Sequence, residues 1–131
     1  MKKLILILLF STVMFSSSSY AGWTAVSEGT GTTNSGNTFY VDFERIRKHD
    51  GYVYWWNLMD YLKPSSTGRL SAKTYNQGDC KLFRYKRLSY SFHDEPMGTG
   101  AGEVQEPEQK GWRYPPPNSG DEIILKQVCN Q

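Results

Sequence analysis

Two cysteines, Cys80 and Cys129, constrain this 131-residue chain more than any other feature. In an oxidising compartment an isolated pair favours a disulfide. The bond would close a 49-residue loop, which is worth about 4 kcal/mol in the chain-entropy treatment and so rivals the net stability of a small domain. A metal site is the weaker alternative, because two cysteines and two distant histidines offer no familiar ligand spacing.

The N-terminus predicts that the chain reaches such a compartment. Lys2 and Lys3 precede an apolar run over residues 4–10, and a serine run then leads to Tyr20 and Ala21. This is the order of a secretory leader with a small-residue cleavage site after Ala21. The apolar stretch is too short for a membrane anchor, which needs about 20 residues. We therefore expect residues 1–21 to be a signal peptide, and the protein to reside in the periplasm or at the cell surface.

The remaining residues, 22–131, are enough for a single domain with one core. Without Lys2 and Lys3 this part carries 13 basic and 13 acidic residues, so the basic isoelectric point of the whole chain belongs partly to the leader. The composition therefore predicts neither a nucleic-acid partner nor, after cleavage, a transmembrane segment.

Hydrophobic patterning predicts an α+β fold. Aromatic and β-branched residues indicate strands over residues 23–26, 38–41, 52–61, 70–75 and 80–92, with a short helical stretch over residues 43–49. Gly-rich or polar residues 28–37, 63–68, 76–79 and 97–102 predict loops, turns and a bend. Ser119 begins a capping box, and Ile124, Leu125 and Val128 form the apolar stripe of a C-terminal helix. We expect a mainly antiparallel sheet of about six strands with this helix packed on one face, joined by one disulfide.

The sequence contains no recognisable catalytic site. Strand neighbours point to opposite faces, so His93 and Asp94 form no ready dyad, and both His93 and His49 are interpreted as surface residues. The glycines between positions 98 and 102 lack the spacing and following helix of a dinucleotide loop. We therefore expect a protein that is not an enzyme and has no metal or cofactor.

Charge is distributed unevenly along the domain. Residues 63–92 contain seven basic residues and one acidic residue, whereas residues 94–108 contain five acidic residues and no Lys or Arg. Such asymmetry can steer a charged partner. The alternative is two neighbouring segments that neutralise each other across the sheet.

Aromatic residues make up 15% of the chain, and one helix cannot cover both faces of a six-stranded sheet. Exposed aromatic residues bordered by Arg and Lys are typical of a recognition surface. The candidate residues are Lys63, Arg69, Lys73, Tyr75, Arg84, Tyr85, Lys86 and Arg87. The alternative is a second, minor core beneath the loops, with the basic residues forming a solvated face.

The order of these features resembles the bacterial surface-adhesin protein E family. The residues that carry the resemblance run in sequence from Trp23 through Phe39-Tyr40-Val41-Asp42, Ile46-Arg47-Lys48, Asp60-Tyr61-x-Lys63-Pro64, Ser71-x-Lys73, Asp79-Cys80, Pro96-Met97-Gly98-x-Gly100, Trp112 and Pro117-x-Ser119 to Val128-Cys129. The resemblance implies a small antiparallel sheet with a C-terminal helix and a disulfide between Cys80 and Cys129. It also implies binding of host matrix and serum proteins through the basic stretch 63–87, with Arg69, Lys73 and Tyr75 the closest matches.

These observations lead to a first hypothesis of an exported, non-enzymatic binding domain that engages a protein, either a host matrix protein or an envelope component. Two other functions remain open at this point. One is a periplasmic carrier of a small ligand or haem-like cofactor on the aromatic face, and the other is an envelope accessory protein.

Overall fold

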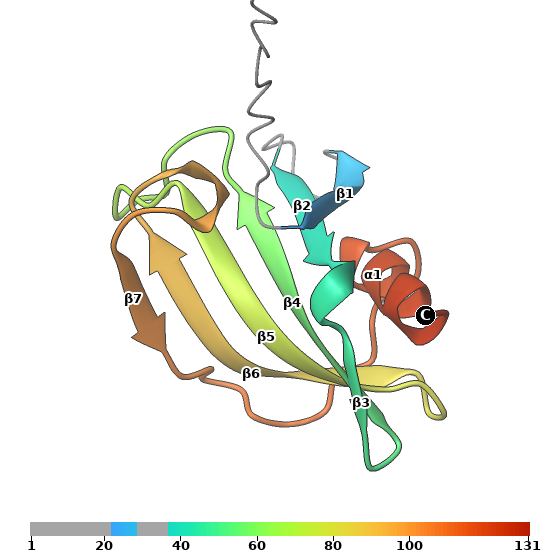
Figure 1. Cartoon of the computed structure of the whole chain (residues 1–131). Coiled ribbons are helices and arrows are strands. Elements are labelled where there is room, and N and C mark those ends of the chain that lie inside the picture. The colour runs from blue at the N-terminus through green and yellow to red at the C-terminus, as the bar shows by residue number, and fades with distance from the viewer. Residues whose placement is uncertain (1–21, 29–36) are drawn as a thin grey trace, which may run out of the picture.

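The computed structural model describes residues 22–28 and 37–131, so the predicted leader and most of the loop predicted over residues 28–37 lie outside the described part. Seven antiparallel strands form one sheet in the order β1-β2-β4-β5-β6-β7, with β3 pairing to β4 (Figure 1). The strands are β1 Trp23–Glu28, β2 Thr38–Asp42, β3 Arg47–His49, β4 Tyr52–Asp60, β5 Ser71–Asp79, β6 Arg84–His93 and β7 Gly102–Gln105. The predicted α+β class and antiparallel sheet are confirmed.

The C-terminal helix α1 spans Gly120–Cys129 and begins where the capping residues predict. The Ser119 side chain accepts a hydrogen bond from the Glu122 backbone N–H, while the Glu122 carboxylate accepts one from the Asn118 N–H. Each satisfies a backbone donor that has no partner within the first turn. Figure 1 shows α1 beside β1, β2 and β4, with β7 at the far side of the sheet.

The main core lies between α1 and the sheet. It contains Val41, Val53, Trp55, Tyr85, Ile124, Leu125 and Val128, all at most 5% exposed. Along β4 the side chains alternate, and Val53 and Trp55 point toward the helix as the period-two pattern predicts. The three predicted helix residues are buried against them, so the helix packs on one face of the sheet.

The turn between β5 and β6 lies four residues later than predicted. Residues 76–79 belong to β5, and residues 80–83 form the turn, in which Phe83 has a φ of 51°. Gly78 does not form a turn; it lies within β5, where the side chains of Trp55 and Val53 pack directly against its backbone. A Cβ at that position would lie 2.8 Å from the Trp55 ring and 2.9 Å from Val53. Consequently β6 begins at Arg84, and the strand predicted over residues 80–92 starts too early.

The helical stretch predicted over residues 43–49 is also wrong. Only Phe43–Arg45 forms a 3₁₀ turn, η1, after which Ile46 is extended and β3 pairs with β4. Asp50 and Gly51 connect these strands with φ values of 50° and 81°. Asp-Gly is favoured in tight hairpins, where both central residues need positive φ, so the dipeptide marks a hairpin and not a helix end.

A strand, β7, replaces part of the irregular segment predicted around the glycines. The 3₁₀ turn η2, Pro96–Gly98, precedes it, and Gly102 is paired with His93 of β6. A Cβ on Gly102 would lie 2.6 Å from the His93 ring, so this glycine makes room for the imidazole. His49 is exposed as predicted, but the surface prediction for His93 is wrong, because this residue is 5% exposed.

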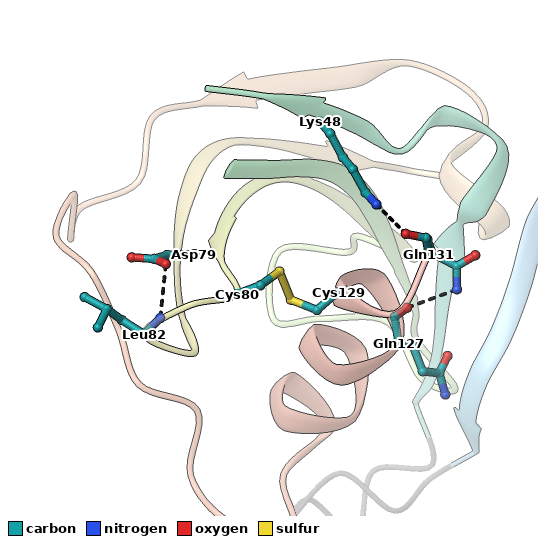
Figure 2. The surroundings of a disulfide bond; sticks show 7 residues. All are labelled: Lys48, Asp79, Cys80, Leu82, Gln127, Cys129 and Gln131. Carbon is teal, nitrogen blue, oxygen red and sulfur yellow. Dashed lines mark hydrogen bonds between the residues drawn. A yellow bond between two sulfur atoms is a disulfide. The ribbon is translucent and has the colours of Figure 1, made fainter. Parts of the chain in front are cut away.

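The two cysteines form the predicted disulfide. Cys80 in the β5–β6 turn is bonded to Cys129 in the last turn of α1, with a Cα–Cα distance of 5.7 Å (Figure 2). Beside it, Lys48 of β3 donates a hydrogen bond to the main-chain carbonyl of Gln131. The bond joins the helix to the sheet.

Candidate functional site

The candidate site lies on the sheet face opposite α1, which we call the open face. Side chains that are opposite one another in antiparallel strands share a face, so the register assigns each residue to one side. Tyr54 pairs with Gln77, which pairs with Lys86, and Trp56 pairs with Tyr75. These positions alternate with the core residues Val53 and Trp55, and they therefore point away from the helix.

Aromatic side chains form a nearly continuous band across this face. The Trp56 and Tyr75 ring centroids are 4.8 Å apart, and those of Tyr54 and Tyr75 are 6.2 Å apart. Farther along β4, Tyr52 lies 5.6 Å from Trp112. All five rings are partly exposed, so the band is available to a ligand.

Trp112 reaches the open face from outside the sheet. Residues 106–111 run along the edge of β6, and Arg113 then exchanges two backbone hydrogen bonds with Tyr85, at 2.9 and 2.7 Å. This anchoring holds Trp112 over two cations. The Arg84 guanidinium lies 4.4 Å, and the Lys86 ammonium 4.8 Å, from the centre of the indole ring. Such contacts are worth about 0.5–1 kcal/mol at exposed sites and restrict where both cations can lie.

An ion pair lies beneath Trp112. Arg84 Nε donates to Asp79 Oδ2 at 3.0 Å, and Asp79 Oδ1 accepts the Leu82 backbone N–H at 3.1 Å. The hydrogen bond from Leu82, followed by that from Arg84, holds the pKa of Asp79 below its usual value. Burial is the largest influence on Arg84 and acts to lower its pKa, but the bond and charge of Asp79 together with those of Tyr114 outweigh it, so that pKa is raised. The pair therefore stays ionised at neutral pH and cancels its own charge.

Other cations on the open face lack such a partner. Lys86 contacts Trp112 but forms no ion pair with any described residue, and neither does Lys73 of β5. Arg47, which is opposite Tyr54 in the β3–β4 register, is exposed and likewise unpaired within residues 22–28 and 37–131. The aromatic band is thus bordered by positive charge on both sides. We call Tyr52, Tyr54, Trp56, Tyr75 and Trp112, together with Arg84 and Lys86, the aromatic-basic band.

The structure divides the predicted site residues between the two faces. Tyr75, Arg84 and Lys86 belong to the aromatic-basic band, and Lys73 is next to Tyr75 on the same side of β5. Tyr85 and Arg87 alternate with them on β6 and face the helix. The Tyr85 hydroxyl donates to Asp121 of α1 at 2.7 Å.

Both helix-facing residues have raised pKa values. Burial, followed by the charge of Asp121, raises the pKa of Tyr85 to about 12. Burial is the largest influence on Arg87 and acts to lower its pKa, but the charge of Asp121, 3.5 Å away, together with Tyr90 and Tyr85 outweighs it, so that pKa is raised. Neither side chain belongs to the open face.

Lys63 and Arg69 lie at the opposite end of the sheet from Arg84, in the loop between β4 and β5. Nine strand residues span about 27 Å, so these groups cannot contact one small ligand together with Lys86. Lys63 is exposed, whereas Arg69 donates to Asp94 at 2.7 Å and also to Glu103. The basic and acidic segments therefore neutralise each other at this point. This agrees with the interpretation of the uneven charge as two neighbouring segments that compensate each other, and not with the steering of a charged partner.

A loop covers the end of the open face near η2. Leu58 is fully buried there, and Gly98 lies against it and against the Lys73 side chain. Ser71 Oγ and Asp60 Oδ1 accept the Gly98 and Met97 backbone N–H groups, both at 2.8 Å. Part of the open face is thus a minor core beneath a loop, and only the part from Tyr52 to Trp56 presents the aromatic-basic band.

Sequence reasoning did not place four aromatic residues of this band: Tyr52, Tyr54, Trp56 and Trp112. The first three share one face in the period-two pattern of β4, but that pattern alone does not say which face a helix covers. Trp112 has no local signal, because its position depends on the path of a long connection.

Comparison with known proteins identifies the family. The family model described as surface-adhesin protein E matches residues 23–130. This chain belongs to the surface-adhesin protein E family. The match covers the whole described domain, from the first residue of β1 to the residue after α1, so the resemblance inferred from the order of sequence features is confirmed.

Solved structures of a family member share the fold. The crystal form II structure of Haemophilus influenzae protein E has a TM-score of 0.57 and 16% identity, covering 84% of this chain and 88% of that chain. Protein E from non-typeable Haemophilus influenzae has a TM-score of 0.59 and 16% identity, covering 84% and 76%. No curated protein sequence gives a significant match.

Residues 22–28 and 37–131 contain neither a membrane-spanning helix nor a cluster of metal-ligating side chains. No helix in these residues is long and apolar enough to cross a bilayer. The same residues contain no group of three or more His, Cys, Asp or Glu side chains that could hold a metal ion.

Proposed function

We propose that this protein is an exported, non-enzymatic, adhesin-like binding domain that engages a protein partner through the aromatic-basic band. Membership of the surface-adhesin protein E family supports the adhesin-like class. The sequence of the first 21 residues and the disulfide support export to an oxidising compartment.

The observation that carries the proposal is the position of Trp112. It is held in place by the Arg113 backbone, contacts Tyr52, and lies over two cations. Aromatic and Arg side chains are enriched where protein interfaces derive most of their binding energy, and preorganised rings lose little conformational freedom on binding. The unpaired Lys86 and Arg47 at the border favour a partner whose contacting surface carries carboxylates.

The first experiment measures binding of the purified protein to immobilised extracellular-matrix proteins over a range of salt concentrations. The double substitution Arg84→Glu/Lys86→Glu should abolish binding at low salt, because both cations on one side of the band are reversed. Lys48→Glu/Lys126→Glu is the matched control, since it changes net charge equally but alters two exposed residues away from the open face. Equal binding by the two double variants, both shown to be folded, would exclude the band as the contact surface.

A second experiment tests export. Cells expressing the full chain are fractionated, and the mass of the recovered protein is measured. We expect cleavage after Ala21, no free thiol, and digestion of the protein by protease added to intact cells. Retention inside the outer membrane would favour a periplasmic partner over adhesion.

A further inference from the structure

A hollow on the helix-facing side of the sheet lies between the outer part of β6 and residues 105–113, away from the aromatic-basic band. Its volume is about 290 Å³. Tyr90 and Phe92 form its base, with ring centroids 5.8 Å apart and ring planes within 18°. Tyr90 is opposite Thr74 in the β5–β6 register, so it points to the same side as Asn76 and Gly78. Both rings are partly exposed.

The rim of this hollow is polar. It includes Glu106, Glu108, Gln109 and Arg113, all from the connection that follows β7. Pro107 in the same connection is buried, which fixes the rim against the sheet. A rim of carboxylate, amide and guanidinium groups above aromatic rings offers planar hydrogen-bonding groups and an apolar surface within a few ångströms of each other.

Several of these groups have unused hydrogen-bonding capacity. Arg113 Nε is buried and has no hydrogen-bond partner among residues 22–28 and 37–131, although another nitrogen of the same guanidinium donates to Gln109. The Tyr90 hydroxyl accepts from Arg87 Nη1 at 3.1 Å, which leaves its own proton free to donate. Glu108 forms no hydrogen bond or ion pair with any residue in the described part of the chain. The Tyr90 hydroxyl and the Glu108 carboxylate are therefore available to a ligand, whereas Arg113 Nε, which has almost no accessible surface, gains an acceptor only if its side chain moves.

We propose that this hollow binds a saccharide, specifically an uncharged hexose or N-acetylhexosamine residue. A pyranose ring has an apolar C–H face that can pack on Tyr90 or Phe92, and hydroxyl groups at its edge that both donate and accept. Tyr90 supplies a donor, while Glu108 supplies an acceptor. The volume suits one or two sugar rings and is at the lower limit of ligand pockets. Glu106 is paired with Lys110 at 3.1 Å, so Glu108 is the rim carboxylate that disfavours an acidic sugar.

The test is saturation-transfer NMR with a panel of free sugars: glucose, galactose, N-acetylglucosamine, N-acetylgalactosamine, lactose and glucuronic acid. At least one uncharged sugar should bind with a millimolar dissociation constant, as is usual for so small a contact, and should shift the amide resonances of residues 90–92 and 105–113 in labelled protein. Glucuronic acid should bind more weakly. No transfer from any sugar, or shifts confined to residues 52–56, would overturn the proposal.

Variants separate recognition from stability. Glu108→Gln retains the size of an exposed rim residue and should weaken sugar binding about tenfold, because a neutral amide oxygen replaces the charged acceptor and the hydrogen bond to the sugar is weaker. Glu44→Gln changes an exposed carboxylate on η1 and should leave binding unchanged. Tyr90→Phe, which retains the ring, should also weaken binding. If Glu108→Gln and Tyr90→Phe are folded and bind every sugar like the unmodified protein, the hollow is not the site. The measurement uses free sugars, so its outcome does not depend on the proposed protein partner.

Discussion

The two faces of the sheet contain similar kinds of residue and use them differently. On the helix face, Trp55 is 2% exposed and Tyr85 is 5% exposed, and both pack against α1. On the open face, Trp56 and Tyr75 are only partly buried, and no helix in the described chain covers them. Neighbouring tryptophans on one strand therefore have opposite surroundings.

The difference shows that aromatic content alone does not distinguish a core from a binding surface. On the helix face, α1 is attached to the sheet by the disulfide and by the packing of three buried helix residues. The rings of the open face are held by one another and by the Trp112 connection. Substitutions on the helix face should therefore lower stability, whereas those on the open face should chiefly lower binding.

The largest effect should come from removing the disulfide. Cys80→Ser/Cys129→Ser frees a loop with a sequence separation of 49 and should lower the free energy of unfolding by about 4 kcal/mol, measured by urea denaturation. Reduction of the unmodified protein should give a similar loss. A loss below about 1 kcal/mol would mean that packing alone holds the helix to the sheet.

Leu125→Ala should lower the free energy of unfolding by about 3 kcal/mol, because Leu125 is fully buried and its removal leaves a cavity. Tyr54→Ala on the open face should cost about 1 kcal/mol, since its ring is only partly buried. Equal losses in the two variants, measured by the same denaturation, would remove the distinction between the faces.

Alkaline pH should destabilise the helix face through Tyr85. Its pKa is raised to about 12 in the fold from an ordinary 10.0, so the unfolded chain ionises first. The stabilisation is present below pH 10 and is lost as pH rises toward 12, by about 2–3 kcal/mol. Unfolding measured over this range on fresh samples should show a smaller pH-dependent loss for Tyr85→Phe. Superimposable profiles would show that Tyr85 is not the residue responsible.

Trp112→Ala on the open face should change stability as little as Tyr54→Ala does. Loss of its contacts with Arg84 and Lys86 should lower the free energy of unfolding by about 1 kcal/mol. The loss of partner binding in Trp112→Ala should be much larger than the loss in Leu62→Ala. Leu62 is a suitable control, because it is 68% exposed and lies outside the band. Unchanged partner binding by folded Trp112→Ala would move the site away from the band.

Much of the fold could be predicted from local pattern. Period-two alternation located β4, and the capping serine located the start of α1, because both signals arise within a few residues. Two of the errors concern glycine. Gly78 and Gly102 suggested a turn and a bend, but they lie in paired strands, where a Cβ would meet Trp55 or His93. Whether a glycine serves a turn or a close contact depends on residues far away in the sequence.

The candidate site was predictable only in part, for the same reason. Tyr75, Arg84 and Lys86 were identified as candidates, and alternation along β6 already separates Arg84 and Lys86 from Tyr85 and Arg87. The sequence could not indicate which alternating set the helix would cover.

By itself the sequence determined the strand-rich architecture, the C-terminal helix and the availability of two cysteines for one bond, because these depend on local geometry and composition. Only the tertiary structure decided which face stayed open and which connection residue completed it. A helix can pack on either side of a sheet, and Trp112 reaches Tyr52 only because the backbone of Arg113 pairs with β6. That pairing joins segments whose relative positions no local pattern encodes.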